Sequence, residues 1–217
     1  MAAEAKLKKA VEHHRAGRLD AAEAAYREIL AGRAGDFNAL NLLGTLLLQR
    51  GANDEAEKVL RRAVEVNPGS ADAQMRLGLA NRGLGNESRA EYCFRSSLKL
   101  DPKAADTHYN YGNLLASLER GDEALQAYLA CLKLEPNHVE AHIGLGDLLL
   151  HNERAEPAAA HYQQAVALRP SSLEAILGLG RSARALGKTE EARKIFEKLV
   201  ELDPGHDEAR RSLAELG

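Results

Sequence analysis

Five prolines recur in the sequence at one fixed spacing. Pro68, Pro102, Pro136, Pro170 and Pro204 stand 34 residues apart with no insertion or deletion, and they account for five of the six prolines in the chain. A fixed period of this length is typical of repeat proteins, in which each unit packs mainly against its neighbours. We therefore expect the 217 residues to form an array of repeats rather than a globule around one central core.

The proline spacing divides the chain into six units, followed by a shorter segment. Position 32 is proline in every unit except the first, where it is Ala34. The units are 3–36, 37–70, 71–104, 105–138, 139–172 and 173–206, and the segment is 207–217. Position 20 is always alanine, position 8 is glycine or alanine, and position 24 is large: Tyr26, Leu60, Phe94, Tyr128, Tyr162 and Phe196. Small residues opposite large ones, on apolar faces with helical spacing, predict two closely packed antiparallel helices per unit.

The ends of these helices are also marked in the sequence. Gly17, Gly51, Gly85 and Gly187 recur at position 15, where we expect the first helix of the unit to stop. Position 18 is Asp, Glu or Ser in all six units, and we expect these side chains to suit the free N–H groups and the positive dipole end of the second helix. The sixth proline, Pro157, falls at position 19, in the first turn of a second helix, where a missing N–H costs little.

This pattern resembles the tetratricopeptide repeat (TPR). The stretches Tyr109-Asn-Tyr-Gly-Asn-Leu-Leu and Ala192-x-x-x-Phe196, with Leu202-Asp-Pro204 after it, are close to the usual form of that repeat, and the match runs from residue 3 to 217. The resemblance implies an all-α fold, an α-solenoid forming a right-handed superhelix. It implies one array over 1–217, with 207–217 as a C-terminal capping half-repeat, and a groove lined by the first helices in which partners bind.

Composition excludes several classes of function. A net charge of −3 and a pI near 6.3 give no basic surface for nucleic acid. The sequence has no apolar run long enough for membrane insertion and no secretory leader pattern, and its two cysteines, Cys93 and Cys131, form neither a disulfide framework nor a metal cluster. We expect a cytoplasmic protein without cofactor or metal.

No catalytic motif stands out. His138 and His142 do not form the His-Glu-x-x-His zinc motif, and the Gly-x-Gly stretches at Gly144 and Gly178 lie within predicted helices rather than after strands. His108 and His142 share position 4 of consecutive units, and we interpret them as a stacked, hydrogen-bonded structural pair. The chain is therefore not predicted to be an enzyme.

The resemblance places positions 2, 5, 6, 9, 12 and 13 of each first helix on the groove. Position 5 is mostly apolar, which favours a partner, although it can also pack against the next first helix. The glycines at position 6, Gly144 and Gly178, indicate the close approach of either a ligand backbone or a neighbouring helix. The candidate groove residues are Met75, Arg76, Tyr109, Asn110, Asn113, Ile143, Asp147, Leu177 and Arg181.

Two ligand chemistries known in the family are not supported by these positions. No three consecutive units supply the Lys, Asn and Arg set that clamps an acidic chaperone C-terminus, and only Asn110 occupies position 6 where an asparagine ladder would be needed. The leading hypothesis is a non-catalytic scaffold that binds a protein or peptide ligand in the groove, with self-association possible. The alternatives are the substrate-docking portion of a larger or associated transferase and, below that, a structural oligomer.

Overall fold

The computed structural model describes residues 2–216, and within that range it contains 13 helices and no strand. The expected all-α fold of helical hairpins is therefore confirmed. The helices are α1 (Ala2–Arg15), α2 (Leu19–Gly32), α3 (Phe37–Gln49), α4 (Asn53–Val66), α5 (Ala71–Gly83), α6 (Glu87–Leu100), α7 (Ala105–Ser117), α8 (Gly121–Leu134), α9 (Val139–His151), α10 (Ala155–Leu168), α11 (Leu173–Ala185), α12 (Thr189–Leu202) and α13 (Asp207–Leu216).

Several first helices are capped by the last residue of the preceding unit, at position 34. The side chain of Asp36 accepts a hydrogen bond from the N–H of Ala39 at 3.1 Å, and Ser70 and Ser172 cap α5 and α11 in the same way. Each such cap stabilises its helix by about 1 kcal/mol. The helices α3, α5 and α11 therefore begin directly after a short polar side chain, whereas Ala104 precedes α7.

The second helices differ from the expectation. They begin at position 17, so the position 18 residues lie two residues inside the helix, and the N-cap residues Arg18, Ala52, Asn86, Arg120, Arg154 and Lys188 make no side-chain cap hydrogen bond. The predicted capping by position 18 is therefore wrong. Only one residue, the N-cap, separates the position 15 residue of the turn from the second helix. Carboxylates such as Asp20 therefore lie in the first turn of the helix, where the helix dipole favours negative charge.

Position 15 adopts the left-handed backbone conformation that ends each first helix. Gly17, Gly51, Gly85 and Gly187 have φ angles of 70–72°. In two repeats the residue at this position is a glutamate, and Glu119 and Glu153 are held at φ angles of 58° and 59°. A residue with a Cβ costs roughly 1 kcal/mol or more in this conformation, so these two turns are less stable than their glycine counterparts.

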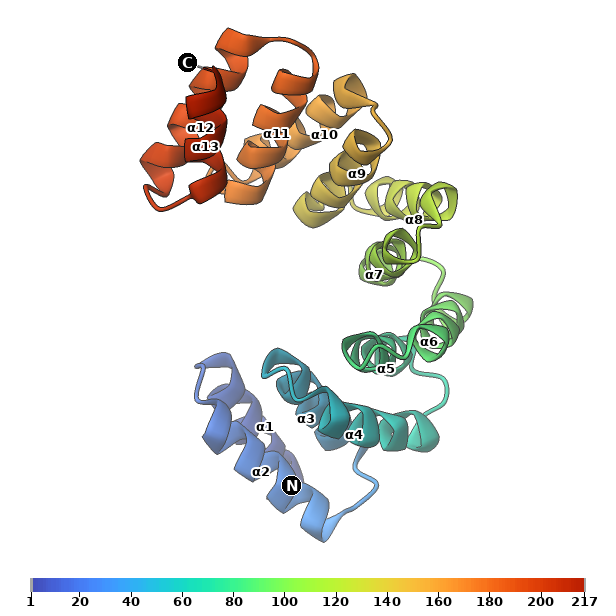
Figure 1. Ribbon diagram of the computed structural model, residues 1–217. Coiled ribbons are helices and arrows are strands. Elements are labelled where there is room, and N and C mark those ends of the chain that lie inside the picture. The colour runs from blue at the N-terminus through green and yellow to red at the C-terminus, as the bar shows by residue number, and fades with distance from the viewer. Residues whose placement is uncertain (1, 217) are drawn as a thin grey trace. The chain divides into compact units, whose positions relative to one another are not determined.

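The chain divides into two compact units, Met1–Asn110 and Tyr111–Gly217, and the division falls within α7. In the first unit the hairpins α1–α2, α3–α4 and α5–α6 pack in sequence order (Figure 1), around a core that contains Tyr26, Leu40 and Leu60. In the second unit α9–α10 and α11–α12 pack in the same way, and α13 covers α12. Phe196 and Ala209 belong to the core of this end.

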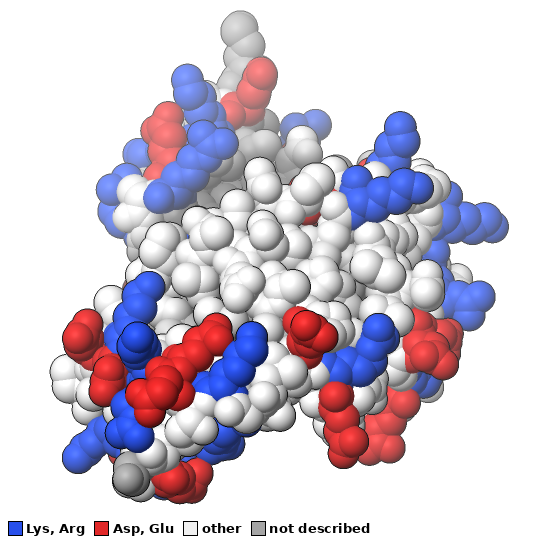
Figure 2. Space-filling model, turned by 90° about the horizontal axis from the view of Figure 1, so that it is seen from above, with Lys and Arg blue, Asp and Glu red and all other residues white. Residues whose placement is uncertain are grey.

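Charge is unevenly distributed over the surface. Figure 2 shows Lys, Arg, Asp and Glu side chains gathered toward the edges of the face in view, around a middle without charged side chains. The stretch 157–168 of α10 contains no Lys, Arg, Asp or Glu, whereas α12 carries charges of both signs along its length. None of the helices in residues 2–216 is both long and apolar enough to cross a membrane.

Candidate functional site

Tyr162 of α10 passes between two glycines on neighbouring first helices. A Cβ placed on Gly146 of α9 would lie 2.8 Å from Cε1 of Tyr162, and one placed on Gly178 of α11 would lie only 2.2 Å from the same atom. The ring is fully buried, and its hydroxyl donates a hydrogen bond of 2.5 Å to Oδ1 of Asp147 on α9. Because both positions are glycine, the Tyr162 ring fits between α9 and α11 and its hydroxyl contacts Asp147.

Tyr128 of α8 repeats this arrangement one unit earlier. Cβ atoms on Gly112 and Gly144 would lie 2.8 and 2.9 Å from its ring. Its hydroxyl donates to Oδ1 of Asn113 at 2.7 Å. These contacts decide between the two interpretations of the position 6 glycines, because what approaches Gly144 and Gly178 is the tyrosine of the neighbouring second helix.

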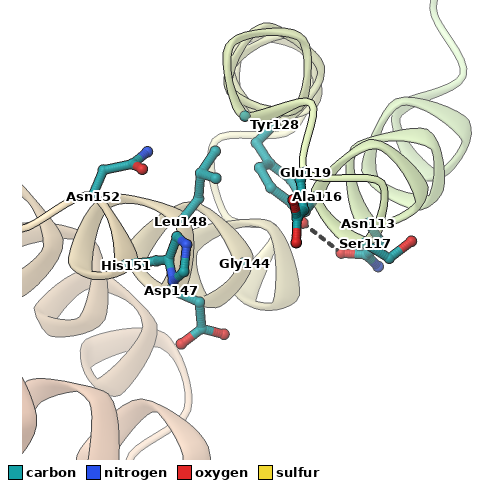
Figure 3. A pocket seen from close by; sticks show the side chains of 11 residues that line it. Asn113, Ala116, Ser117, Glu119, Tyr128, Gly144, Asp147, Leu148, His151 and Asn152 are labelled. Carbon is teal, nitrogen blue, oxygen red and sulfur yellow. Dashed lines mark hydrogen bonds between the residues drawn. The ribbon is translucent and has the colours of Figure 1, made fainter.

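A pocket of about 710 Å³ opens beside Tyr128, between α7 and α9 in the second unit. Figure 3 shows Asn113 and Ser117 projecting from α7, Asp147 and His151 from α9, and Tyr128 between the two helices. The volume falls within the roughly 300–1,000 Å³ that small-ligand sites occupy. The lining residues are Asn113, Ala116, Ser117, Glu119, Gly121, Tyr128, Gly144, Asp147, Leu148, His151 and Asn152.

The electrostatics of the pocket are set by carboxylates. Partial loss of water raises the pKa of Asp147, while the Tyr162 hydrogen bond and the charge of Arg181 act in the opposite direction. Arg181 itself is held by Glu208 through two hydrogen bonds of 2.6 Å, and this pairing lowers the pKa of Glu208. Arg181 therefore donates these hydrogen bonds to α13 rather than to a group in the pocket.

In the second unit, the structure brings two of the predicted groove residues together. Asn113 and Asp147, both at position 9, line the pocket. Arg181 stands at position 9 of the next repeat and lies close enough to influence Asp147. Ile143 is only 7% exposed, and Leu177 is half-buried against the core of α11 and α12, so both of these side chains contribute to packing between helices.

In the first unit, the predicted residues occupy a polar face of the first helices. Arg76 pairs with Asp72 at 2.8 Å and also bonds to Thr45 of α3, while Asn41 donates to Asp72 at 2.8 Å. This network joins α3 to α5. The side chains of Met75, Tyr109 and Asn110 are half-buried, and the Asn110 amide donates to the carbonyl of Asp106 at 2.8 Å.

The sequence-based selection missed part of the pocket. Ser117 stands at position 13, which was expected to face the groove, but it was not among the candidate residues. Leu148 near the end of α9, and Glu119 and Asn152 in the turns after α7 and α9, lie outside the positions expected to face the groove. One signal was present: Glu119 interrupts the run of glycines at position 15. Tyr128 was assigned to the core, which holds for its ring but leaves out the hydroxyl at the pocket.

The histidines have structural partners other than those expected. Nε2 of His108 lies 2.9 Å from the carbonyl oxygen of Pro102, and Nε2 of His142 lies 3.0 Å from that of Pro136. Nδ1 of His142 lies 3.1 Å from Nδ1 of His161 on α10. The hydrogen-bonded partner of His142 is therefore a histidine of its own repeat.

His138 has a local role at the start of α9. Its Nδ1 accepts a hydrogen bond of 3.1 Å from the N–H of Ala141, which makes it the N-cap residue of this helix. Within residues 2–216, no group of three or more His, Cys, Asp and Glu side chains is arranged to hold a metal ion.

The fold and the pocket define a class of protein: helical-hairpin repeats whose first helices present an open, polar-lined surface. Tetratricopeptide repeat models match residues 41–105, 83–133, 109–172 and 149–216. The chain therefore belongs to the tetratricopeptide repeat family, whose members generally act as non-catalytic scaffolds for protein interactions. The first predicted unit, 3–36, lies outside these matches. A comparison with curated proteins found no match.

Solved structures share the fold at low sequence identity. PilW, a type IV pilus biogenesis factor, has a TM-score of 0.89 and 19% identity, with 98% of this chain and 99% of PilW covered. YrrB, described as a TPR protein with an unusual peptide-binding site, has a TM-score of 0.67 and 20% identity, with 87% and 97% covered. Cut9, solved with Hcn1, has a TM-score of 0.88 and 14% identity, covering 99% of this chain and 42% of that one. These likenesses show the fold alone.

Proposed function

We propose that this chain is a non-catalytic scaffold that binds a peptide segment of a partner protein on the first-helix surface, and that the pocket between α7 and α9 is the main contact in the second unit. The observation that carries the proposal is the pocket itself, which combines about 710 Å³ of space with polar groups from two successive first helices. Such a concave, mixed lining is the usual form of a binding site.

The polar groups of the pocket match the needs of a peptide backbone. Because Oδ1 of Asn113 accepts from Tyr128, the amide NH₂ of Asn113 is oriented to donate to something else, such as a peptide carbonyl. Asn152 adds a second amide, and Leu148 adds an apolar wall for a side chain. YrrB, whose structure was described for its peptide-binding site, supports this assignment by analogy.

A blocking substitution tests the proposal. Random dodecapeptides displayed on phage are selected against the full chain, and the binding of the selected peptides is measured by fluorescence polarisation. Ser117→Trp fills the pocket from the exposed end of α7, and we expect it to abolish binding of most selected peptides. Ser88→Trp, on the exposed surface of α6, is the matched control and leaves binding intact.

Circular dichroism establishes that both variants keep their helix content. If no peptide is selected, or if the selected peptides bind the Ser117→Trp variant as well as the parent chain, the pocket is not the peptide site. The candidate residues of the first unit, Met75, Arg76, Tyr109 and Asn110, stay a prediction for a second contact. Tyr109→Ala with Asn110→Ala tests that contact in the same assay.

A further inference from the structure

The pocket between α7 and α9 is lined by two carboxylates and one histidine, His151. Glu119 and Asp147 both line it, and no Lys or Arg does. Within the described part of the chain neither carboxylate forms an ion pair, and the hydrogen bond that Asp147 accepts comes from the neutral Tyr162 hydroxyl. By contrast, Asp72 on α5 and Glu208 on α13 are each paired with an arginine. The pocket therefore keeps negative charge that the protein does not neutralise.

Glu119 also occupies a position that disfavours it. Four of the six repeats have glycine at position 15, with φ angles of 70–72°, whereas Glu119 is held at 58°. Glycine adopts this left-handed backbone conformation without steric strain, so a glutamate at this position lowers the stability of the turn. Glu153 is held at 59° without lining the pocket, so Glu119 is distinguished by its place in the pocket lining rather than by its backbone conformation.

We propose that this pocket takes a lysine or arginine side chain of the bound peptide, with its charged end between Glu119 and Asp147. The inference rests on the proposed function and names the ligand chemistry of that site. The aliphatic stem of the side chain would lie along Leu148 and Ala116, and long cationic side chains commonly bury their stems in this way. The amide of Asn113 is left to hold the adjacent peptide carbonyl.

Ligands of the opposite charge fit the pocket poorly. An acidic side chain or a peptide carboxylate would face Glu119 and Asp147 with no lysine or arginine in the lining. The nearest described arginine that acts on Asp147 is Arg181, and its guanidinium is engaged by Glu208 at 2.6 Å. Charge complementarity therefore selects cations at this point of the surface.

The test uses the dodecapeptides selected on the full chain. We expect them to be enriched in Lys or Arg at one position, and we expect replacement of that residue by Gln in the synthetic peptide to weaken binding about tenfold. Glu119→Gln and Asp147→Asn are each expected to weaken binding of the Lys or Arg peptide roughly two- to fivefold, since partly exposed ion pairs contribute modestly. Both changes keep the shape of the side chain, and Asp147→Asn keeps an acceptor for Tyr162.

Glu153→Gln is the matched control, because Glu153 stands at the same repeat position with a φ angle of 59° but does not line the pocket. It is expected to leave binding unchanged. Two results would overturn the cation site while leaving the peptide site standing. In the first, the selected peptides lose binding with Ser117→Trp but show no preference for Lys or Arg. In the second, the peptides bind the double variant Glu119→Gln, Asp147→Asn as tightly as they bind the parent chain. Selection of no pocket-dependent peptide would overturn both.

Discussion

Replacing Gly178 by alanine is expected to destabilise the second unit, although alanine is the better helix former. In the middle of a helix the change from glycine to alanine ordinarily stabilises by about 1 kcal/mol. Here the new Cβ would lie 2.2 Å from Cε1 and 2.4 Å from Cζ of Tyr162. The ring cannot move aside, because it is fully buried, is faced by Gly146 on its other side, and is bonded to Asp147.

The magnitude follows from these two opposing effects. Overpacking of a well-packed core costs about 1–3 kcal/mol of stability. Because the added Cβ would lie so close to a Tyr162 ring that is held on both sides, we expect the cost to be near the upper end of this range. Subtracting the gain of about 1 kcal/mol in helix propensity leaves a net loss of about 2 kcal/mol for Gly178→Ala. In a Tyr162→Leu background the clash is removed, and the same change should stabilise by about 1 kcal/mol. The coupling between Gly178 and Tyr162 is then about 3 kcal/mol.

A double-mutant cycle measures this coupling. Urea unfolding followed by far-UV circular dichroism gives the free energy of unfolding for the parent, the two single variants and the double variant. Gly32→Ala, at the end of α2 where an added Cβ meets nothing within 4 Å, is the control and should change stability little. If Gly178→Ala stabilises the chain with Tyr162 present, the close approach of α11 to the ring is wrong.

Three further predictions concern stability elsewhere. Asn81 is 2% exposed and its Oδ1 has no partner within the described residues, so Asn81→Leu should raise the free energy of unfolding by about 1–2 kcal/mol, measured by urea titration. Ser172→Ala removes the acceptor for the N–H of Ala175 and should lower it by about 1 kcal/mol. Burial and the neighbouring His142 lower the pKa of His161, so its contribution to stability is present above the ordinary histidine pKa and is lost as pH falls through the lowered value. The drop in Tm between about pH 7.5 and about pH 5.5 should therefore be smaller in His161→Gln.

Most of the fold could be predicted from the proline spacing. The helices that follow Pro68, Pro136 and Pro170 begin at the residues that the 34-residue period gives, because the period fixes both the turn and the next N-cap. The capping of the second helices could not be predicted in the same way. Whether Asp20 is the N-cap or the second residue of the helix depends on a two-residue shift of the helix start, which the pattern of residue types does not determine.

The candidate site was harder to predict because it depends on contacts between repeats. Position 24 predicted a buried ring for Tyr128, and the ring is buried. That its hydroxyl reaches Asn113 depends on Gly112 and Gly144 together, one on each of two successive helices. Comparing the repeats position by position shows each glycine separately. Only the packing of the helices shows that both glycines contact the same tyrosine.

Two residues around the pocket differ from those of the preceding repeat, and each has an intrinsically unfavourable backbone preference at its position. Gly144 stands inside α9, where glycine costs roughly 1 kcal/mol relative to alanine, and the corresponding residue of the preceding repeat is Asn110. Glu119 stands in a left-handed turn, where a Cβ costs roughly 1 kcal/mol or more, and the corresponding residue of the preceding repeat is Gly85. The chain therefore has a glycine that helix propensity alone disfavours and a glutamate in a turn that favours glycine. Both residues shape the same cavity, since Gly144 admits the ring of Tyr128 and Glu119 adds a carboxylate to the lining.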